Sequence, residues 1–236
     1  MGSRILLLVS GLAVLAACTA PPQTSRFITV ANQPANVGDA GIAARAYHDH
    51  GAYDRDLMVV AGNAEKWVAQ RAAFVPRPAL VLDVDETALS NWEIIKLDDF
   101  GRPIAGPCIP GSGAPCGWAA WDLLGRDPAI RPTLQLFQAA RSANLSVFFI
   151  TGRPEAQRAA TERNLRRAGF DGYTKLFMVP DGARFASAKD FKTPVRIQIE
   201  RMGYAIIANV GDQPSDLLGG HAEKDFLLPD PFYRVP

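Results

Sequence analysis

The sequence has no excess of charge of one sign. Its 25 Lys and Arg residues nearly balance its 24 Asp and Glu residues, which gives a formal net charge of +1 at pH 7. Proteins that bind nucleic acid usually carry a strongly basic surface, so the composition predicts no nucleic acid polymer among the partners. Internal repeats are absent as well. The 236 residues therefore fit one medium domain with short accessory segments.

Long hydrophobic runs are scarce, and the apolar run at the N-terminus is short. Met1 to Arg4 carry one positive charge, and an apolar segment over residues 5–17 follows. This segment is too short to span a bilayer comfortably, and its flanks match an export signal. We therefore expect residues 1–17 to be a signal peptide.

The segment closes with Leu15-Ala16-Ala17-Cys18, which closely resembles the bacterial lipobox. That resemblance implies cleavage before Cys18 and lipidation of its thiol and amine, and several acyl chains together anchor a protein stably. The alternative is a plain secretory signal in which Cys18 is incidental. Residues 18–38 are rich in Pro, Asn, Gln, Ser and Thr, a composition typical of a flexible tether.

These N-terminal features predict a protein held by lipid to a membrane of a bacterial cell envelope, facing the periplasm or the cell surface. Thr19 follows the cysteine, and because this position is not an aspartate, analogy with enterobacterial sorting favours the outer membrane.

Cysteine is rare, and its number is odd. If Cys18 carries lipid, only Cys108 and Cys116 remain, in the Gly- and Pro-rich stretch GPCIPGSGAPCG. Outside the cytoplasm such a pair can oxidise and close a small loop. The alternative is a structural metal site, but zinc would need two further ligands. The disulfide is the better interpretation.

Short apolar runs alternate with helical patterns along the rest of the chain. Strands are expected over residues 79–83, 145–151, 175–179 and 205–210. Helices are expected over residues 39–50, 54–74, 132–143, 154–168 and 189–202. This alternation indicates an α/β fold with a parallel sheet covered by helices on both faces. The stretch over residues 87–132 is too long for a simple connection, which indicates a functional insertion.

Polar side chains follow the predicted strands. The first strand ends in Asp83-Val84-Asp85, the second in Thr151-Gly152-Arg153, and the fourth in a segment containing Asp212 and Asp216. Ligands of open parallel sheets bind outside the carboxyl ends of the strands. Carboxylates gathered at one edge repel each other and must be offset by a cation. The pattern therefore predicts a cation-dependent site at this edge.

Four ordered motifs resemble those of the haloacid-dehalogenase superfamily. More narrowly, the chain looks like its secreted acid phosphatases, which are the bacterial class C lipoprotein enzymes and the related plant acid phosphatases and vegetative storage proteins. The resemblance runs from about Ala43 to the C-terminus. It is carried by LVLDVDETALSN at 80–91, FITGRPE at 149–155, FKTPVR at 191–196 and NVGDQPSDL at 209–217, with YHDHGAYDRDL at 47–57 and LPDPFY at 228–233.

The resemblance implies a Rossmann-like (haloacid dehalogenase) parallel sheet flanked by helices, with a small, mainly helical cap. The phosphatase domain would cover residues 39–236, with the cap drawn from about residues 39–75 and 91–130.

The resemblance also implies a mechanism. Asp83 would attack phosphorus and form an aspartyl-phosphate, while Asp85 would protonate the leaving oxygen and then activate water. Mg²⁺ would be held by Asp83, by the backbone carbonyl of Asp85 and by Asp212, with Asp216 supporting the metal or a bound water. The cation is needed because a carboxylate that attacks a phosphate dianion meets like-charge repulsion.

The phosphate would be bound by Thr151, Gly152 and Lys192. Lys192 fits the family pattern Lys-x-x-x-Arg, whereas Lys189, three residues earlier, is the less favoured alternative. Pro194 suggests that the helix begins close to Lys192. Arg153 fits a phosphate or substrate contact and a surface charge about equally well.

The small-molecule substrate implied by the resemblance is a phosphate monoester, with 5′-nucleotides as one class. Asn91 and Trp92 lie next to the nucleophile motif and are candidate contacts to the leaving group. Trp118 and Trp121 fit a small core better than a substrate-stacking face.

Two further phosphatase chemistries lack their motifs, because the sequence contains no Arg-His-Gly and no Cys-x5-Arg. Two alternatives remain open: a catalytically weak binding or storage protein of the same fold, and phosphotransfer to an alcohol acceptor. The sequence makes no prediction of the oligomeric state.

Overall fold

The computed structural model of this chain describes residues 34–236, and Asn36–Pro236 form one compact unit. The predicted signal peptide, the lipidation site at Cys18 and most of the tether lie outside the described residues. Within residues 34–236, no helix is both long enough and apolar enough to cross a membrane.

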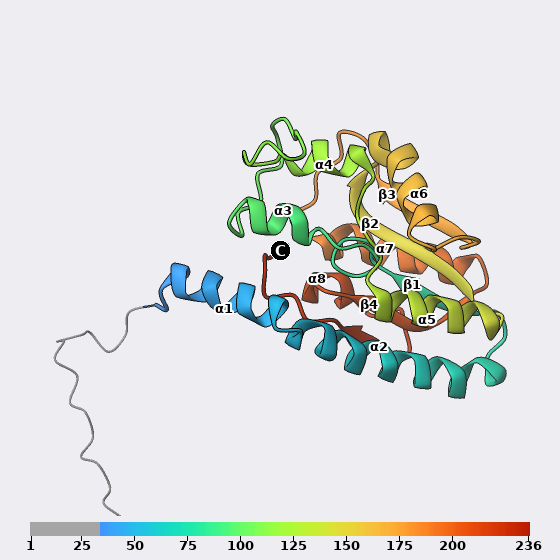
Figure 1. Cartoon of the computed structure of the whole chain (residues 1–236). Coiled ribbons are helices and arrows are strands. Elements are labelled where there is room, and N and C mark those ends of the chain that lie inside the picture. The colour runs from blue at the N-terminus through green and yellow to red at the C-terminus, as the bar shows by residue number, and fades with distance from the viewer. Residues whose placement is uncertain (1–33) are drawn as a thin grey trace, which may run out of the picture. The chain divides into compact units, whose positions relative to one another are not determined.

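A five-stranded parallel sheet forms the centre of the unit, in the order β3-β2-β1-β4-β5 (Figure 1). The strands are β1 (Pro78–Leu82), β2 (Ser146–Pro154), β3 (Lys175–Val179), β4 (Ala205–Gly211) and β5 (Asp225–Leu227). The predicted α/β class and parallel sheet are confirmed. The edge strand β5 was not predicted, because it has three residues and only Phe226 is buried.

Helices cover both faces of this sheet. They are α1 (Val37–Asp49), α2 (Ala52–Arg71), α3 (Trp92–Leu97), α4 (Trp118–Leu124), α5 (Arg131–Ser142), α6 (Arg158–Arg167), α7 (Ala188–Arg201) and α8 (Pro214–Leu217), with short 3-10 turns at Ala72–Phe74 and Glu155–Gln157. Helices α2 and α5 pack against each other and against the sheet, and α7 packs on β2 and β4 (Figure 1).

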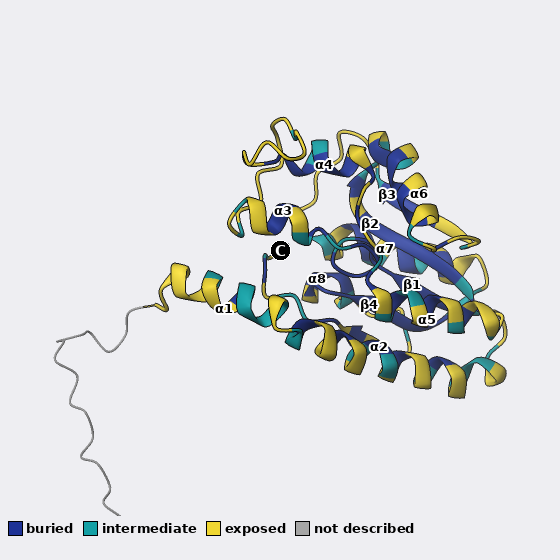
Figure 2. Cartoon of the chain, viewed as in Figure 1, coloured by how far each residue is buried: buried dark blue, intermediate teal, exposed yellow. Residues whose placement is uncertain are grey.

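The central strand β1 is apolar because both of its faces are buried (Figure 2). Leu80 and Leu82 join the larger core cluster, which also contains α5 residues. Ala79 and Val81 join a second cluster with α7 residues. Successive side chains of a strand point to opposite faces, so the single run PALVL contributes to both cores.

Two local predictions are corrected by the structure. Pro154 does not open a helix but ends β2, and a 3-10 turn separates it from α6. Helix α7 begins at Ala188 after a capping box formed by Ser187 and Asp190. Pro194 therefore lies inside this helix rather than at its start.

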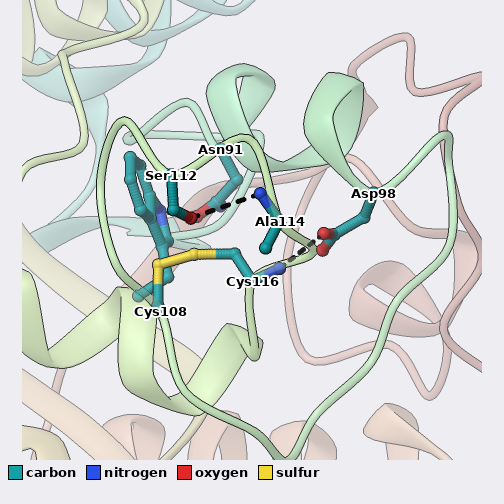
Figure 3. The surroundings of a disulfide bond; sticks show 7 residues. Asn91, Asp98, Cys108, Ser112, Ala114 and Cys116 are labelled. Atoms are coloured by element: carbon teal, nitrogen blue, oxygen red, sulfur yellow. Dashed lines mark hydrogen bonds between the residues drawn. A yellow bond between two sulfur atoms is a disulfide. The ribbon is translucent and has the colours of Figure 1, made fainter.

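The insertion between β1 and β2 contains α3 and α4 and an exposed loop. The structure joins Cys108 and Cys116 in the disulfide that the sequence predicts (Figure 3). The N–H of Cys116 also donates to Asp98 at 2.7 Å, which ties the loop to the end of α3.

The predicted cap also included residues 39–75, which contain α1 and α2. Helix α2 packs along α5 and against β4 and β5. It therefore covers a face of the sheet, whereas residues 91–130 keep their predicted role as the insertion.

Candidate active site

Three carboxylates meet where β1 and β4 end. Asp83 directly follows β1, and its backbone N–H donates to Val210 of the neighbouring β4. Asp212 directly follows β4, and Asp216 lies in the short helix α8. All three side chains are buried, and one carboxylate oxygen from each lies within 4.8 Å of the others.

A single lysine lies against this group of carboxylates. The ammonium of Lys192 is 2.5 Å from Asp83 Oδ1 and 2.7 Å from Asp216 Oδ1, and its side chain is buried. Lys189 is exposed. The structure therefore selects Lys192, and the favourable pairing raises its pKa despite the burial that opposes it.

The three carboxylates carry more negative charge than one lysine can offset. Burial raises the pKa of Asp83 to about 7 against the opposing charge of Lys192. Burial also raises the pKa of Asp212 well above its usual range, and the nearby charges of Asp216 and Asp83 add to the rise. A cluster of hard oxygen donors that is short of positive charge fits a divalent cation such as Mg²⁺. These residues therefore suit the predicted metal.

Asp85 lies in a different environment from Asp83, although both line one cavity. Its Oδ1 accepts from Arg153 Nη2 at 2.6 Å and from Asn91 Nδ2 at 2.9 Å. Burial alone would raise the pKa of Asp85, but the charge and hydrogen bonds of Arg153 outweigh burial and lower it. Asp85 is outside the carboxylate group, so a metal contact through its backbone carbonyl stays a prediction.

Arg153 is not a surface charge, and that interpretation is wrong. Its side chain is 2% exposed and bonds Asp85. The same Nη2 lies 3.1 Å from Asp127 and 3.4 Å from Asp122. Asp122 lies in α4 and Asp127 in the stretch between α4 and α5, and no motif singled out either residue in the sequence.

The end of β2 also holds the two other predicted phosphate-binding residues. Thr151 is fully buried, and its hydroxyl accepts from the N–H of Arg153 at 3.1 Å. Gly152 lines the cavity beside Asp83. Their contacts to phosphate stay predictions.

The two candidate leaving-group contacts are placed elsewhere. Asn91 is fully buried, donating to Asp85 and accepting from Trp121 Nε1 at 3.1 Å. Trp92 stacks on His48 with ring centroids 3.7 Å apart, and it lines a separate cavity. Neither side chain lines the cavity at Asp83. Direct contact of these two residues with a leaving group is therefore not supported.

The cavity at Asp83 has a volume of about 290 Å³. Trp118 lines it, and both Trp118 and Trp121 are buried members of the larger core cluster, as the sequence predicts. The Trp118 ring meets the Tyr233 ring edge-on with centroids 5.1 Å apart, and the guanidinium of Arg102 lies over the Trp118 ring at 4.7 Å. The walls thus combine charged groups with aromatic groups.

The arrangement of these motifs is matched by a known family. A model described as "HAD superfamily, subfamily IIIB (Acid phosphatase)" matches residues 12–236. The chain belongs to this family.

Two plant proteins illustrate how similar other members are. The chain is 32% identical over 163 residues to "Stem 28 kDa glycoprotein" of Glycine max, covering 68% of this chain and 61% of the relative. It is 32% identical over 160 residues to "Acid phosphatase 1" of Solanum lycopersicum, covering 67% and 60%. The chain thus spans about three fifths of the length of these curated relatives.

A solved structure shares the fold. "The structure of the Class C acid phosphatase from Bacillus anthracis" superimposes with a TM-score of 0.65 at 20% identity, covering 84% of this chain and 86% of that chain. At this identity the likeness concerns the fold alone. The shared fold agrees with the parallel sheet found in this chain, a member of subfamily IIIB.

The C-terminal segment of this subfamily IIIB chain adds groups that the sequence motifs did not assign. Gln213 donates to both Asp212 and Asp230, at 2.7 and 2.6 Å. The Tyr233 hydroxyl donates to the buried carboxylate of Glu86 at 3.0 Å. The motif LPDPFY had marked this segment without a role. The contacts show that it closes one side of the site and orients Asp212 through Gln213.

Proposed function

We propose that this chain is a Mg²⁺-dependent acid phosphatase that hydrolyses phosphate monoesters through an aspartyl-phosphate on Asp83. The observation that carries the proposal is the pairing of Asp83 with Lys192 beside Asp212 and Asp216, at the end of the central strand. A carboxylate with these neighbours is placed to act as a nucleophile toward an anion.

In the first half of the reaction, an oxygen of Asp83 forms a bond to phosphorus as the ester oxygen leaves. Lys192 offsets the charge of Asp83 and of the phosphoryl oxygens. Asp85 gives its proton to the departing oxygen, which leaves as an alcohol.

In the second half, Asp85 accepts a proton from water while the water oxygen bonds phosphorus. The bond between phosphorus and Asp83 then breaks and releases inorganic phosphate. Arg153 and Asn91 hold the Asp85 carboxylate in place for both proton transfers.

Asp83, Asp212 and Asp216 would hold the metal, with the carbonyl of Asp85 as the further ligand that the family pattern implies. Bound Mg²⁺ supplies the positive charge that lets a carboxylate and a phosphate dianion approach each other.

A chromogenic phosphomonoester tests this proposal. With p-nitrophenyl phosphate and the domain over residues 36–236, we expect turnover that EDTA abolishes and added Mg²⁺ restores. The variant Asp83→Asn should lose essentially all turnover, because the nucleophile is gone. Turnover that continues in EDTA, or full activity in Asp83→Asn, would exclude the proposed mechanism.

For the substrate, we propose small phosphomonoesters with 5′-nucleotides as one class. The aromatic wall formed by Trp118 and Tyr233 supports a planar leaving group. A phosphate-release screen over nucleotides, sugar phosphates and phosphoamino acids tests this preference, and equal rates for all three classes would oppose it.

Simple assays distinguish the proposed function from the two alternatives, a storage protein and a phosphotransferase. A storage protein of this fold would release no phosphate, and the intact set of carboxylates and Lys192 argues against that alternative. Phosphotransfer would yield a phosphorylated alcohol when glycerol or a nucleoside is in excess, whereas we expect inorganic phosphate to be the main product.

We also propose that Cys18 is lipidated after cleavage of residues 1–17, which would hold the enzyme at a bacterial envelope membrane facing the periplasm or the surface. The support is the N-terminal sequence alone. Expression of the full chain should give a membrane-bound protein, and Cys18→Ala should release it or block its processing. Equal membrane binding by both forms would oppose this proposal.

A further inference from the structure

Asp85 is held by a guanidinium that has its own supports. Arg153 donates from Nη2 to Asp85 Oδ1 at 2.6 Å and from Nε to both carboxylate oxygens, at 3.1 and 3.2 Å. A planar guanidinium that grips a carboxylate at several points fixes the orientation of that carboxylate as well as its position.

Nη2 of Arg153, which bonds Asp85, also faces two more buried carboxylates. It donates to Asp127 Oδ2 at 3.1 Å and lies 3.4 Å from Asp122 Oδ1. Both acids precede α5 in the insertion and are absent from the carboxylate group around Lys192. Buried acids cost free energy unless they are paired, and the proposed phosphoryl transfer gives neither of them a chemical step.

Asp127 is itself fixed to helix α6. The side chain of Asn164 accepts from Asp127 N at 2.9 Å and donates to Asp127 O at 2.7 Å. Both residues are buried. A continuous set of bonds therefore runs from Asn164 through Asp127 and Arg153 to Asp85.

We propose that Asp127, together with Asp122, is a positioning residue for the proton transfers of Asp85, and that it acts by fixing Arg153. The proposal rests on the proposed function, in which Asp85 protonates the leaving oxygen. Without Asp127 and Asp122, which share Nη2 of Arg153 with Asp85, the guanidinium can turn, and the carboxylate that it holds turns with it. General acid catalysis depends steeply on such alignment.

Two esters with different leaving groups distinguish a misplaced Asp85 from a general structural defect, because a general defect would slow both esters equally. Alkyl alcohols are very weak acids, so an alkyl phosphate needs a well-placed proton donor. p-Nitrophenol is far more acidic, so p-nitrophenyl phosphate needs little protonation of the leaving oxygen. A misplaced Asp85 therefore slows the alkyl ester selectively. The ratio kcat/KM isolates the step in which the phosphoenzyme forms, before water attacks.

The experiment compares glycerol 3-phosphate with p-nitrophenyl phosphate in the Mg²⁺-loaded enzyme. Asp127→Asn keeps the size of the side chain and the backbone bonds to Asn164 while removing the negative charge that faces Arg153. We expect its kcat/KM to fall about tenfold or more for the alkyl ester and about twofold for the aryl ester. Asp122→Asn should show the same selectivity to a smaller degree, since its contact to Arg153 is longer.

Controls separate the outcomes. Glu162→Gln, at a half-buried position of α6 that pairs with Arg158 and not with Arg153, should leave the rates with both substrates unchanged. If Asp127→Asn does not fold, Asp122→Asn decides the test. Equal losses for the two esters, or no loss, would overturn the positioning role. Full activity in Asp83→Asn would instead overturn the proposed function, so the two failures are distinguishable.

Discussion

At the scale of single residues, the site has few positively charged side chains to offset its buried carboxylates. Lys192 serves two carboxylates and Arg153 contacts three. Removing one partner of a buried ion pair leaves an uncompensated charge, which costs much more than the intact pair contributes. Each of these two cations therefore controls stability and chemistry together.

Replacement of Lys192 tests this dependence. In Lys192→Met, Asp83 and Asp216 lose their counter-charge, and we expect the metal-free protein to lose about 3 kcal/mol of unfolding free energy or more. In the Mg²⁺-loaded enzyme, kcat should fall about a hundredfold or more because a charge on the phosphoryl group goes unmatched. Denaturant unfolding and steady-state kinetics measure the two effects. Lys189→Met, on the exposed part of the same helix, is the matched control, and an equal effect of both variants would contradict the assignment.

Prediction from sequence succeeded for residues that directly follow a strand. Asp83, Asp212 and Lys192 were placed correctly because strand ends and one helix bring them together. It failed for Asp122 and Asp127, which meet Arg153 only through the path of a long insertion that has no periodic pattern. Trp92 was misjudged for a related reason, since closeness to the motif in sequence does not decide which cavity a side chain lines.

At the scale of elements, the junction of β4 and α8 allows very close contact. Gly211 ends β4, and a methyl group built on it would lie 2.6 Å from both Cβ and Oδ2 of Asp216. Such a distance is shorter than any van der Waals contact, so the absence of a side chain is what lets Asp216 reach the carboxylate group. Helix α8 then holds Asp216 through its bond to the N–H of Gln213.

The substitution Gly211→Ala tests this junction. We expect Asp216 to be displaced and the apparent Mg²⁺ affinity to fall about tenfold, equivalent to about 1.4 kcal/mol. Titration of activity with Mg²⁺ measures the effect. Gly62→Ala in α2, where a methyl group meets nothing within 4 Å, should leave the Mg²⁺ affinity unchanged and stabilise the helix slightly. Unaltered affinity in Gly211→Ala would contradict the role of the close contact.

At the scale of the whole molecule, the buried acids link folding to pH. Burial raises the pKa of Asp83 and Asp122 to about 7 and the pKa of Asp127 and Asp230 to about 6. The folded protein without metal therefore holds more protons than the unfolded chain between about pH 4 and 7.

The sign of the pH effect follows from these shifts. Acids with a raised pKa stabilise the metal-free fold at low pH, and this stability is lost as the pH rises through about 6 to 7. Each such acid changes the free energy of unfolding by about 1.4 kcal/mol for each pH unit within its window. We expect the Tm in EDTA to fall from pH 5 to pH 7.5. Added Mg²⁺ should restore it mainly at the higher pH, where more of Asp83 is ionised and can bind the cation. Asp122→Asn should flatten the EDTA profile, and a Tm in EDTA that rises with pH would contradict this account.

The central claim is that Asp83 carries the phosphoryl group. Rapid acid quenching of the Mg²⁺-loaded enzyme with a radiolabelled phosphomonoester, followed by peptide mapping, tests it most directly. The account predicts transient, base-labile label on the peptide that contains Asp83, and no label in Asp83→Asn. Label on another residue, or full turnover without any labelled enzyme, would contradict it.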